Sequence, residues 1–296
     1  RIQVVEERGT AKEREKLADL ARQIRRDVVR MVRGALSGHP GGALGIAEIM
    51  AALYAREMTH RPASGRGEDR DRLVLSNGHI CAAQYSALAR VGLIESAELS
   101  RFRRLGSRLQ GHPSHVFMPE FVDASVGPLG QGFSVANGLA LGLRLSGGTG
   151  RVYCIVGDGE MQEGQVWEAL MTAAKFRLSN LLLFISYNGI QIDGAVDDVK
   201  RIEPLSDRLA AFGWKAMDID GHDIGAILGA FASAREETSK PTAIVARTVM
   251  GKGVPFMEGL AKWHGTCPTA DEAAAALEAI GSAAGYQDFP FEGGRP

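Results

Sequence analysis

Two side chains with metal-binding oxygens stand at the ends of two neighbouring apolar segments. Asp158 lies between two glycines directly after the run 152–156, and Asn188 follows the run 181–185. Such short apolar runs predict parallel strands that are buried on both faces, and successive strands of this kind end at the same sheet edge. The glycines allow unusual backbone angles and lack the Cβ atoms that would hold a phosphate away, while Asp158 offers the hard oxygen that Mg²⁺ prefers. The pattern predicts a site for a metal-bound diphosphate.

Four of the seven histidines lie in segments marked by glycine or proline, where loops are expected: His39, His79, His112 and His264. Beside an aspartate and an asparagine, they indicate a polar cleft with several proton donors. His79 is expected in the first turn of a helix, where free N–H groups attract anions. A zinc site is not indicated, because the histidines lack the close spacing of zinc motifs and no cysteine lies near them.

The other polar candidates have ordinary structural explanations. His60 is expected at the surface and His222 in a turn, while His115 stays unassigned. Glu160 is interpreted as a residue that complements the dipole of the helix that follows it. The same explanation is open for Glu163 and Glu168.

The elements that must position these residues alternate along the chain. Apolar periodicity and glycine or proline punctuation predict strands at 72–75, 152–156, 181–185, 214–219 and 242–247, and helices at 11–36, 45–57, 79–91, 205–212, 224–236 and 271–284. Alternation of this kind predicts an α/β fold with a doubly wound, mainly parallel sheet flanked by helices. Residues 1–296 are expected to form a single domain, with a helical N-terminal extension at 11–60 and an α/β core at 72–250.

Composition excludes several classes of partner. The 296 residues carry a formal net charge of −1, which gives no basis for binding nucleic acid or an anionic membrane. The longest apolar stretch, 129–145, is interrupted by polar residues and shorter than a membrane span, and the charged N-terminus lacks a signal segment. Three widely spaced cysteines do not form a disulfide framework, so a cytoplasmic location is expected.

The segment GDGEMQEGQVWEA, followed by SYNGIQIDG, resembles the diphosphate-binding motif of thiamine-diphosphate enzymes, and of transketolase in particular. The segments SGHPGG, LSNGH, LQGHP, VGPLGQG, DGHD and WHG resemble transketolase segments in the same order, over residues 12–268. The resemblance implies the diphosphate-binding (PP-type) domain of that fold. Four residues depart from the family pattern, namely Asp123, Ser186, Thr266 and Cys267.

The resemblance also implies a cofactor site. Mg²⁺ or Ca²⁺ would be held by Asp158, by the side chain of Asn188 and by the main-chain oxygen of Ile190. The remaining contacts to thiamine diphosphate would come from His79, Gly127, Leu129, Gly159 and His264. Of these, the two histidines and the amide of Gly159 would meet the diphosphate, while the Gly127 carbonyl and Leu129 would meet the rings.

Catalytic roles follow in the same way. His39 and His112 would face the substrate oxygens and move protons while a two-carbon unit passes from a ketose phosphate to an aldose. Glu163 and Glu168 match glutamates of the family's subunit interface that link two active sites, and this role replaces the dipole explanation for both. The activity expected is that of a transketolase-type transferase.

No pyrimidine-binding domain is expected within these residues. The resemblance therefore implies the N-terminal subunit of a split transketolase, completed by a C-terminal subunit, in an α2β2 assembly; a fragment of a full-length enzyme is the second interpretation. Three alternatives remain open at this point: the α subunit of a 2-oxo acid dehydrogenase, a related thiamine-diphosphate synthase and a non-catalytic subunit. The donor and acceptor sugars are not indicated, because the residues that select them would lie mostly on the partner.

Overall fold

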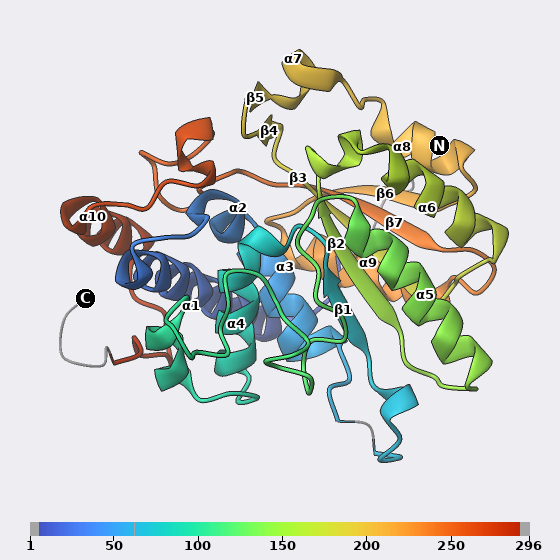
Figure 1. The fold of residues 1–296 in the computed structure, drawn as a ribbon, viewed down its shortest axis with the longest axis horizontal. Helices are drawn as coiled ribbons and strands as arrows, with labels where there is room; N and C mark the ends of the chain where they lie inside the picture. Colours follow the sequence, from blue (N-terminus) through green and yellow to red (C-terminus); the bar gives the residue numbers. More distant parts are fainter. Residues whose placement is uncertain (1–5, 62, 291–296) are drawn as a thin grey trace.

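A central parallel sheet organises the computed structural model, which describes residues 6–61 and 63–290 (Figure 1). The sheet has five strands in the order β1-β2-β3-β7-β6, and every neighbouring pair is parallel. The strands are β1 (Arg72–Leu75), β2 (Val152–Gly157), β3 (Leu181–Tyr187), β6 (Lys215–Asp220) and β7 (Thr242–Arg247), and a separate short hairpin pairs β4 (Ile190–Gln191) with β5 (Gly194–Ala195). The predicted α/β fold class is thereby confirmed.

Helices cover both faces of this sheet. They are α1 (Ala11–Ala35), α2 (Pro40–Gly45), α3 (Ala47–Ala52), α4 (Cys81–Arg90), α5 (Gln131–Leu145), α6 (Gly164–Lys175), α7 (Val196–Lys200), α8 (Leu205–Ala211), α9 (Ile224–Glu236) and α10 (Ala270–Ile280). None of the helices within the described ranges is long and apolar enough to cross a membrane.

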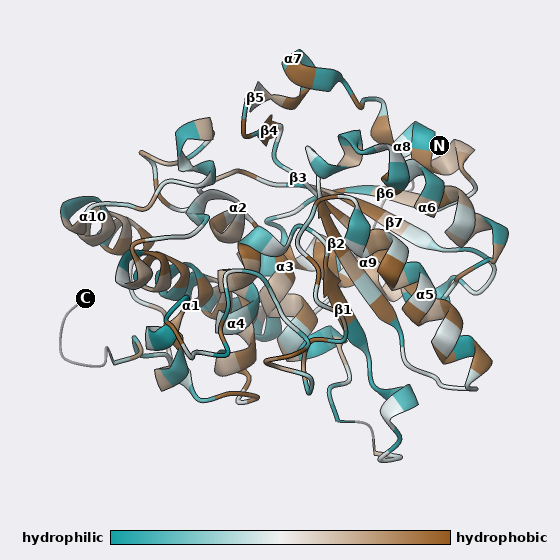
Figure 2. Cartoon of the chain, in the orientation of Figure 1, coloured by the Kyte–Doolittle hydropathy of each residue, from teal (hydrophilic) through white to brown (hydrophobic). Residues whose placement is uncertain are grey.

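Alternation of side chains along the strands divides the interior into two cores. Tyr153, Ile155 and Phe184 face one core, which they share with α1, α3, α4 and α9. Cys154, Val156 and their neighbours face the other core, which α5, α6 and α8 complete. Because both faces are covered, the central strands β2 and β3 are largely apolar, as their brown colour in Figure 2 shows. The N-terminal helices thus form part of the layer that covers the first face.

The first helix matches its predicted range almost to the residue. The Thr10 hydroxyl accepts a hydrogen bond from the Glu13 amide at 3.2 Å, and Leu36 ends the helix in the left-handed region with φ of 54°. The second predicted helix, 45–57, was wrong in detail. Helical structure already begins at Pro40, a residue suited to a first helical position, and continues as α2, α3 and a π-helical turn, Leu53–Glu57.

A buried carboxylate connects α1 to α4. Asp27 is 0% exposed and accepts hydrogen bonds from Arg90 through both oxygens at 2.7 Å. Ser86 and Gln23 donate to the same carboxylate at 2.6 and 2.9 Å. A charge removed from water in this way is tolerated only with full pairing, so this cluster fixes how the two helices pack.

We expect Asp27→Ala to lower the free energy of unfolding by about 3–5 kcal/mol, because the Arg90 guanidinium would stay buried without its counter-charge. Urea unfolding followed by circular dichroism measures this. A matched control is Glu236→Ala, which removes a carboxylate that is 67% exposed and pairs with Arg8 at 3.4 Å; its expected cost is below about 1 kcal/mol. Equal effects of the two substitutions would contradict this explanation of the helix packing.

Candidate active site

The pairing of β2 with β3 brings together the two side chains that were predicted to bind a metal. Gly157 stands opposite Ser186 in the parallel register, so Asp158 and Asn188 both leave the sheet at its carboxyl edge. The carboxylate of Asp158 is 2% exposed and accepts the amides of Gly189 at 2.5 Å and Gly159 at 2.9 Å. Burial raises the pKa of Asp158 to about 6, and the two amide hydrogen bonds oppose that rise.

The glycines beside Asp158 do not use the backbone freedom that their residue type allows. Neither has a positive φ, and Gly159 lies in the ordinary right-handed helical region with φ of −61°. A Cβ atom at Gly159 would stand 2.8 Å from the Cβ of Gln191, which is too close for two carbon atoms. Gly159 is therefore required for the close approach of the β4–β5 hairpin, a role that the sequence did not indicate.

A cavity of about 390 Å³ opens at this edge of the sheet. All but two of the residues predicted for the site line it: His39, His79, His112, Leu129, Asp158, Gly159, Glu163, Asn188, Ile190 and His264. Of the two exceptions, Gly127 supports the ring of His112, whose Cδ2 atom lies 3.0 Å from where a Cβ of Gly127 would be. Glu168 is exposed on α6 and does not reach the cavity. The predicted residues are thus brought together, although the roles assigned to them stay predictions.

Three of the histidine rings meet on one wall of the cavity. The ring centroid of His79 lies 5.1 Å from that of His39 and 5.1 Å from that of His264, and the latter two are 5.8 Å apart. Burial, followed by the neighbouring histidines, lowers the pKa of His79 to about 3. Burial, followed by Arg103, lowers the pKa of His39 to about 4. The pKa values of His112 and His264 are lowered as well, chiefly by burial.

The electrostatics of this cavity fit an anionic ligand accompanied by a cation. The Nδ1 atom of His39 and the Oδ1 atom of Asn77 are buried and, among the described residues, have no hydrogen-bond partner. Both residues line the cavity, so a bound group can satisfy them. The described ranges contain no group of three His, Cys, Asp or Glu side chains arranged to hold a metal. A cation held by Asp158, an amide and a carbonyl would therefore need ligand oxygens to complete its shell.

Glu160 does not have the role in complementing a helix dipole that the sequence suggested. It is 2% exposed and accepts hydrogen bonds from the Ser76 hydroxyl, from the Gly130 amide at 2.8 Å and from the Gly157 amide at 3.2 Å. Burial raises its pKa, against the effect of these three bonds. The dipole interpretation was wrong because it considered only the neighbours along the helix, and Glu160 bonds residues that are distant in the sequence.

His222 is another residue that sequence reasoning missed. It lies in the predicted turn, but its Nδ1 atom contacts Glu48 at 3.1 Å and its Nε2 atom accepts the Val249 amide at 2.9 Å. Since Nε2 accepts, the proton of the neutral ring is on Nδ1 and is donated to Glu48. His222 therefore holds the segment before Met250, which lines the cavity. The motif Asp-Gly-His-Asp was the only signal in the sequence.

The two remaining histidines have structural partners. The ring of His60 stacks on Tyr54 with centroids 5.2 Å apart, and its Nε2 atom contacts the Tyr54 carbonyl oxygen at 3.0 Å. His60 is thus packed more closely than the surface position predicted for it. The Nδ1 atom of His115 contacts the Val122 carbonyl oxygen at 2.7 Å. The ring of His115 does not line the cavity.

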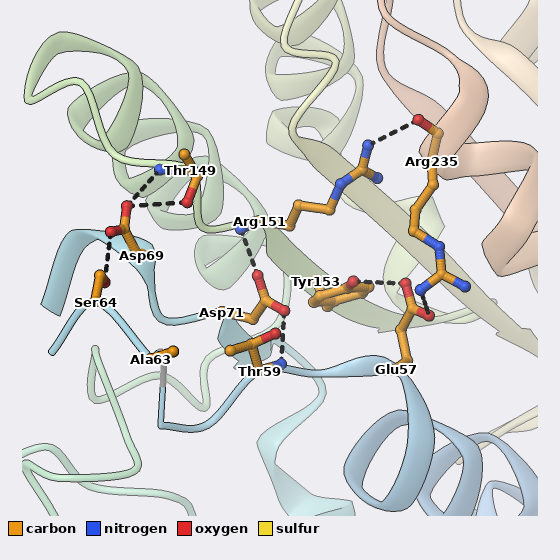
Figure 3. Close-up of a pocket in the computed structure, with 10 residues that line it drawn as sticks. All are labelled: Glu57, Thr59, Ala63, Ser64, Asp69, Asp71, Thr149, Arg151, Tyr153 and Arg235. Atoms are coloured by element: carbon orange, nitrogen blue, oxygen red, sulfur yellow. Dashed lines mark hydrogen bonds and ion pairs between the residues drawn. The ribbon is translucent and has the colours of Figure 1, made fainter. Parts of the chain in front are cut away.

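A second cavity, of about 420 Å³, lies at the opposite ends of β1 and β2 (Figure 3). Its carboxylates are already engaged: Asp71 accepts the amides of Thr59 and Arg151 at 2.8 and 2.7 Å, and Asp69 accepts the Thr149 amide at 3.0 Å. Glu57 is bonded to the Tyr153 hydroxyl at 2.8 Å and to Arg235. None of the buried unpartnered atoms among the described residues belongs to this cavity. The described residues of this cavity therefore contain no buried polar atom that needs a ligand as its hydrogen-bond partner.

The fold and the first cavity define an α/β domain that presents a polar, histidine-rich pocket at the carboxyl edge of its sheet. Comparison with known proteins refines this class. Residues 15–292 match the family described as "Transketolase, thiamine diphosphate binding domain". The chain belongs to the transketolase family, whose members are transferases, and the match favours this family over the α subunit of a 2-oxo acid dehydrogenase.

Two similar proteins are named as separate subunits. The chain is 44% identical to the 6-deoxy-6-sulfo-D-fructose transketolase subunit SqwG of Clostridium sp. (strain MSTE9), over 77% of this chain and 82% of that protein. It is 36% identical to an apulose-4-phosphate transketolase subunit of Phocaeicola vulgatus, over 84% of this chain and 88% of that one. In contrast, the solved transketolase of Campylobacter jejuni matches with a TM-score of 0.83 and 32% identity, over 91% of this chain but 43% of that one. The chain thus spans about two fifths of that longer transketolase.

We expect His79 to make stability depend on pH. Its lowered pKa means that below about pH 6.5 the unfolded chain binds a proton that the folded chain rejects. This contribution to stability is complete above that pH and is lost as the pH falls toward 3. Between about pH 7.5 and pH 5, the free energy of unfolding should fall by about 1–2 kcal/mol more in the wild type than in His79→Asn.

Urea unfolding of the cofactor-free protein at the two pH values measures this difference. The raised pKa of Asp158 acts in the opposite direction, but it is common to both proteins and cancels in the comparison. An identical pH dependence in the wild type and His79→Asn would mean that the His79 ring is not held neutral by its surroundings.

Proposed function

We propose that this chain is the cofactor-binding subunit of a two-chain transketolase that transfers a two-carbon ketol unit from a ketose phosphate to an aldose acceptor. The observation that carries the proposal is the cavity that is lined both by the buried Asp158 carboxylate and by a cluster of three histidine rings with lowered pKa values. Two similar proteins that are named as transketolase subunits support the two-chain arrangement.

The metal and the diphosphate would be held at the sheet edge. Asp158, the Asn188 side chain and the Ile190 carbonyl offer oxygen ligands to Mg²⁺ or Ca²⁺, and all three residues line the cavity. A cation there would lower the raised pKa of Asp158, because an opposite charge favours the ionised form. Thiamine diphosphate supplies the nucleophilic carbon and electron sink that cleavage of a ketose carbon–carbon bond needs.

The histidines would perform two different tasks. His79 and His264 would donate hydrogen bonds to the diphosphate, and its negative charge would raise the lowered pKa values of both rings. The Gly159 amide, which donates to Asp158 at 2.9 Å in this structure, would turn to the diphosphate once a cation occupies the carboxylate. His39 and His112 would face the substrate hydroxyl and carbonyl oxygens and would accept or donate a proton at their ring nitrogens. The buried, unpartnered Nδ1 atom of His39 is available for such an exchange.

The rings of the cofactor would meet residues close to His112. The Gly127 carbonyl would accept a hydrogen bond from the exocyclic amine, and Leu129 would pack beside the rings. Leu129 is 41% exposed and lines the cavity, so its apolar side chain is available to a ligand.

A partner subunit would close the open side of this site. Ile192 lines the cavity and is 71% exposed, and the neighbouring Glu163 is exposed too. We propose that a C-terminal subunit with the pyrimidine domain covers this rim in an α2β2 assembly, and that Glu163 and Glu168 link two active sites across the subunit interface. We also place the protein in the cytoplasm, since its three cysteines are free thiols and two of them are buried.

Asp158→Ala should weaken binding of thiamine diphosphate in the presence of Mg²⁺ by at least about a hundredfold, because removal of even outer-shell groups costs about 10–100-fold. Calorimetric titration of the assembly with the partner subunit measures this affinity. Asp207→Ala, at an exposed position on α8, should bind the cofactor like the wild type. Unchanged affinity in Asp158→Ala would overturn the metal assignment.

The activity itself is tested by reconstitution with the partner. Ketol transfer should appear only when both chains, thiamine diphosphate and Mg²⁺ are present, and this chain alone should show no turnover. Suitable donors include ordinary ketose phosphates, together with the 6-deoxy-6-sulfo-D-fructose and apulose 4-phosphate named for the two similar subunits. A 2-oxo acid serves as the control substrate. Steady turnover by this chain alone, or consumption of only the 2-oxo acid, would refute the proposal.

A further inference from the structure

Glu160 joins three segments that are far apart in the sequence. Its Oε1 atom accepts the Ser76 hydroxyl at the end of β1 and the Gly130 amide at the start of α5, the latter at 2.8 Å. Its Oε2 atom accepts the amide of Gly157, the last residue of β2, at 3.2 Å. One carboxylate thus connects two strand ends and a helix start.

Each of these segments carries residues of the cavity. Ser76 is followed by Asn77 and His79, and Gly130 directly follows Leu129. Gly157 directly precedes Asp158. Three loops that contribute residues to the cavity wall are therefore joined by hydrogen bonds to one carboxylate, that of Glu160.

The packing around the carboxylate leaves little freedom for the loops to shift. A Cβ atom at Gly132, in the first turn of α5, would lie 2.7 Å from the Cα atom of Ser76, so the helix start sits directly on the strand end. Gly130 itself has φ of 83°, in the left-handed region that favours glycine. The backbone there is suited to one arrangement, and in that arrangement its amide points to Glu160.

We propose that Glu160 is the positioning residue of the cofactor site, which holds the loops of Asn77, Leu129 and Asp158 in register for thiamine diphosphate. The proposal rests on the proposed function, because it concerns binding of the same cofactor. Glu160 acts through hydrogen bonds to these loops, and all three of its described bonds are to protein groups. Only a carboxylate of this length offers acceptors to all three donors, since an amide side chain replaces one acceptor by an N–H donor.

The test is Glu160→Gln in the full chain assembled with its partner subunit. The glutamine NH₂ group cannot accept, so at least one buried donor loses its bond. We expect the dissociation constant for thiamine diphosphate with Mg²⁺ to rise about tenfold to a hundredfold, measured by calorimetry at a temperature where circular dichroism shows the variant fully folded. Hydrogen exchange at the Gly130 and Gly157 amides should become faster in the cofactor-free variant.

Two further variants keep the test interpretable. Ser76→Ala removes a single donor and leaves both backbone amides bonded, so it should weaken cofactor binding less than Glu160→Gln and provides a milder test if Glu160→Gln does not fold. Glu236→Gln makes the same chemical change at a carboxylate that is 67% exposed, and it should leave the affinity and the exchange rates at their wild-type values.

The outcomes separate this inference from the proposed function. If the wild-type assembly does not bind thiamine diphosphate, the proposed function fails. If the wild type binds thiamine diphosphate, and both Glu160→Gln and Ser76→Ala bind it as tightly as the wild type does, Glu160 is not a positioning residue. This holds even if the variants melt at a lower temperature. A purely stabilising role would lower the melting temperature without changing the dissociation constant of the folded protein.

Discussion

The parallel pairing of β2 with β3 is the constraint on which the rest of the site depends. Because Gly157 stands opposite Ser186, Asp158 leaves the sheet beside the loop that begins at Asn188. The Asp158 carboxylate accepts a hydrogen bond from the Gly189 amide in this loop, at 2.5 Å. A shift of one residue in this register would turn the apolar side chains of each strand to the opposite core. The two separate cores, one on each face, bury the strands and thereby fix the positions of the oxygens that we propose as metal ligands.

The cavity shifts the pKa values of its ionisable groups in directions that a bound ligand would reverse. Burial raises the pKa of Asp158 to about 6 and lowers that of His79 to about 3, so both side chains are disfavoured as ions in the protein alone. A cation beside the carboxylate and an anion beside the histidines would reverse both shifts. The site is in this sense built for a pair of opposite charges, as a metal-bound diphosphate provides, whereas the carboxylates of the cavity in Figure 3 already have protein partners.

Much of this arrangement could be predicted from the sequence. The strands β2 and β3 are continuous apolar runs ended by Gly157 and by the asparagine loop, and local pattern alone was sufficient to place them. The four loop histidines were expected in one cleft because strand ends and helix starts gather at one sheet edge, and all four line the same cavity.

The residues that were misjudged depend on partners that no local pattern specifies. Glu160 bonds Ser76, which is 84 positions away, and His222 bonds Glu48, 174 positions away. Gly159 is required by contact with Gln191, and its own backbone angles are ordinary. Helix propensity was also insufficient to predict the helix that begins at Pro40. The glycines after Pro40 indicated a loop, but this segment packs closely against Met250 and Trp263 as a short helix.

The central claim is that Asp158, Asn188 and Ile190 hold the metal that anchors the cofactor. Its most direct test is a crystal structure of the protein with thiamine diphosphate and Mn²⁺ in place of Mg²⁺, analysed by anomalous scattering. We predict one strong anomalous peak between the Asp158 carboxylate, the Asn188 side-chain oxygen and the Ile190 carbonyl oxygen, in contact with the diphosphate. Bound cofactor with no peak at these oxygens, or with the peak at other residues, would contradict the account.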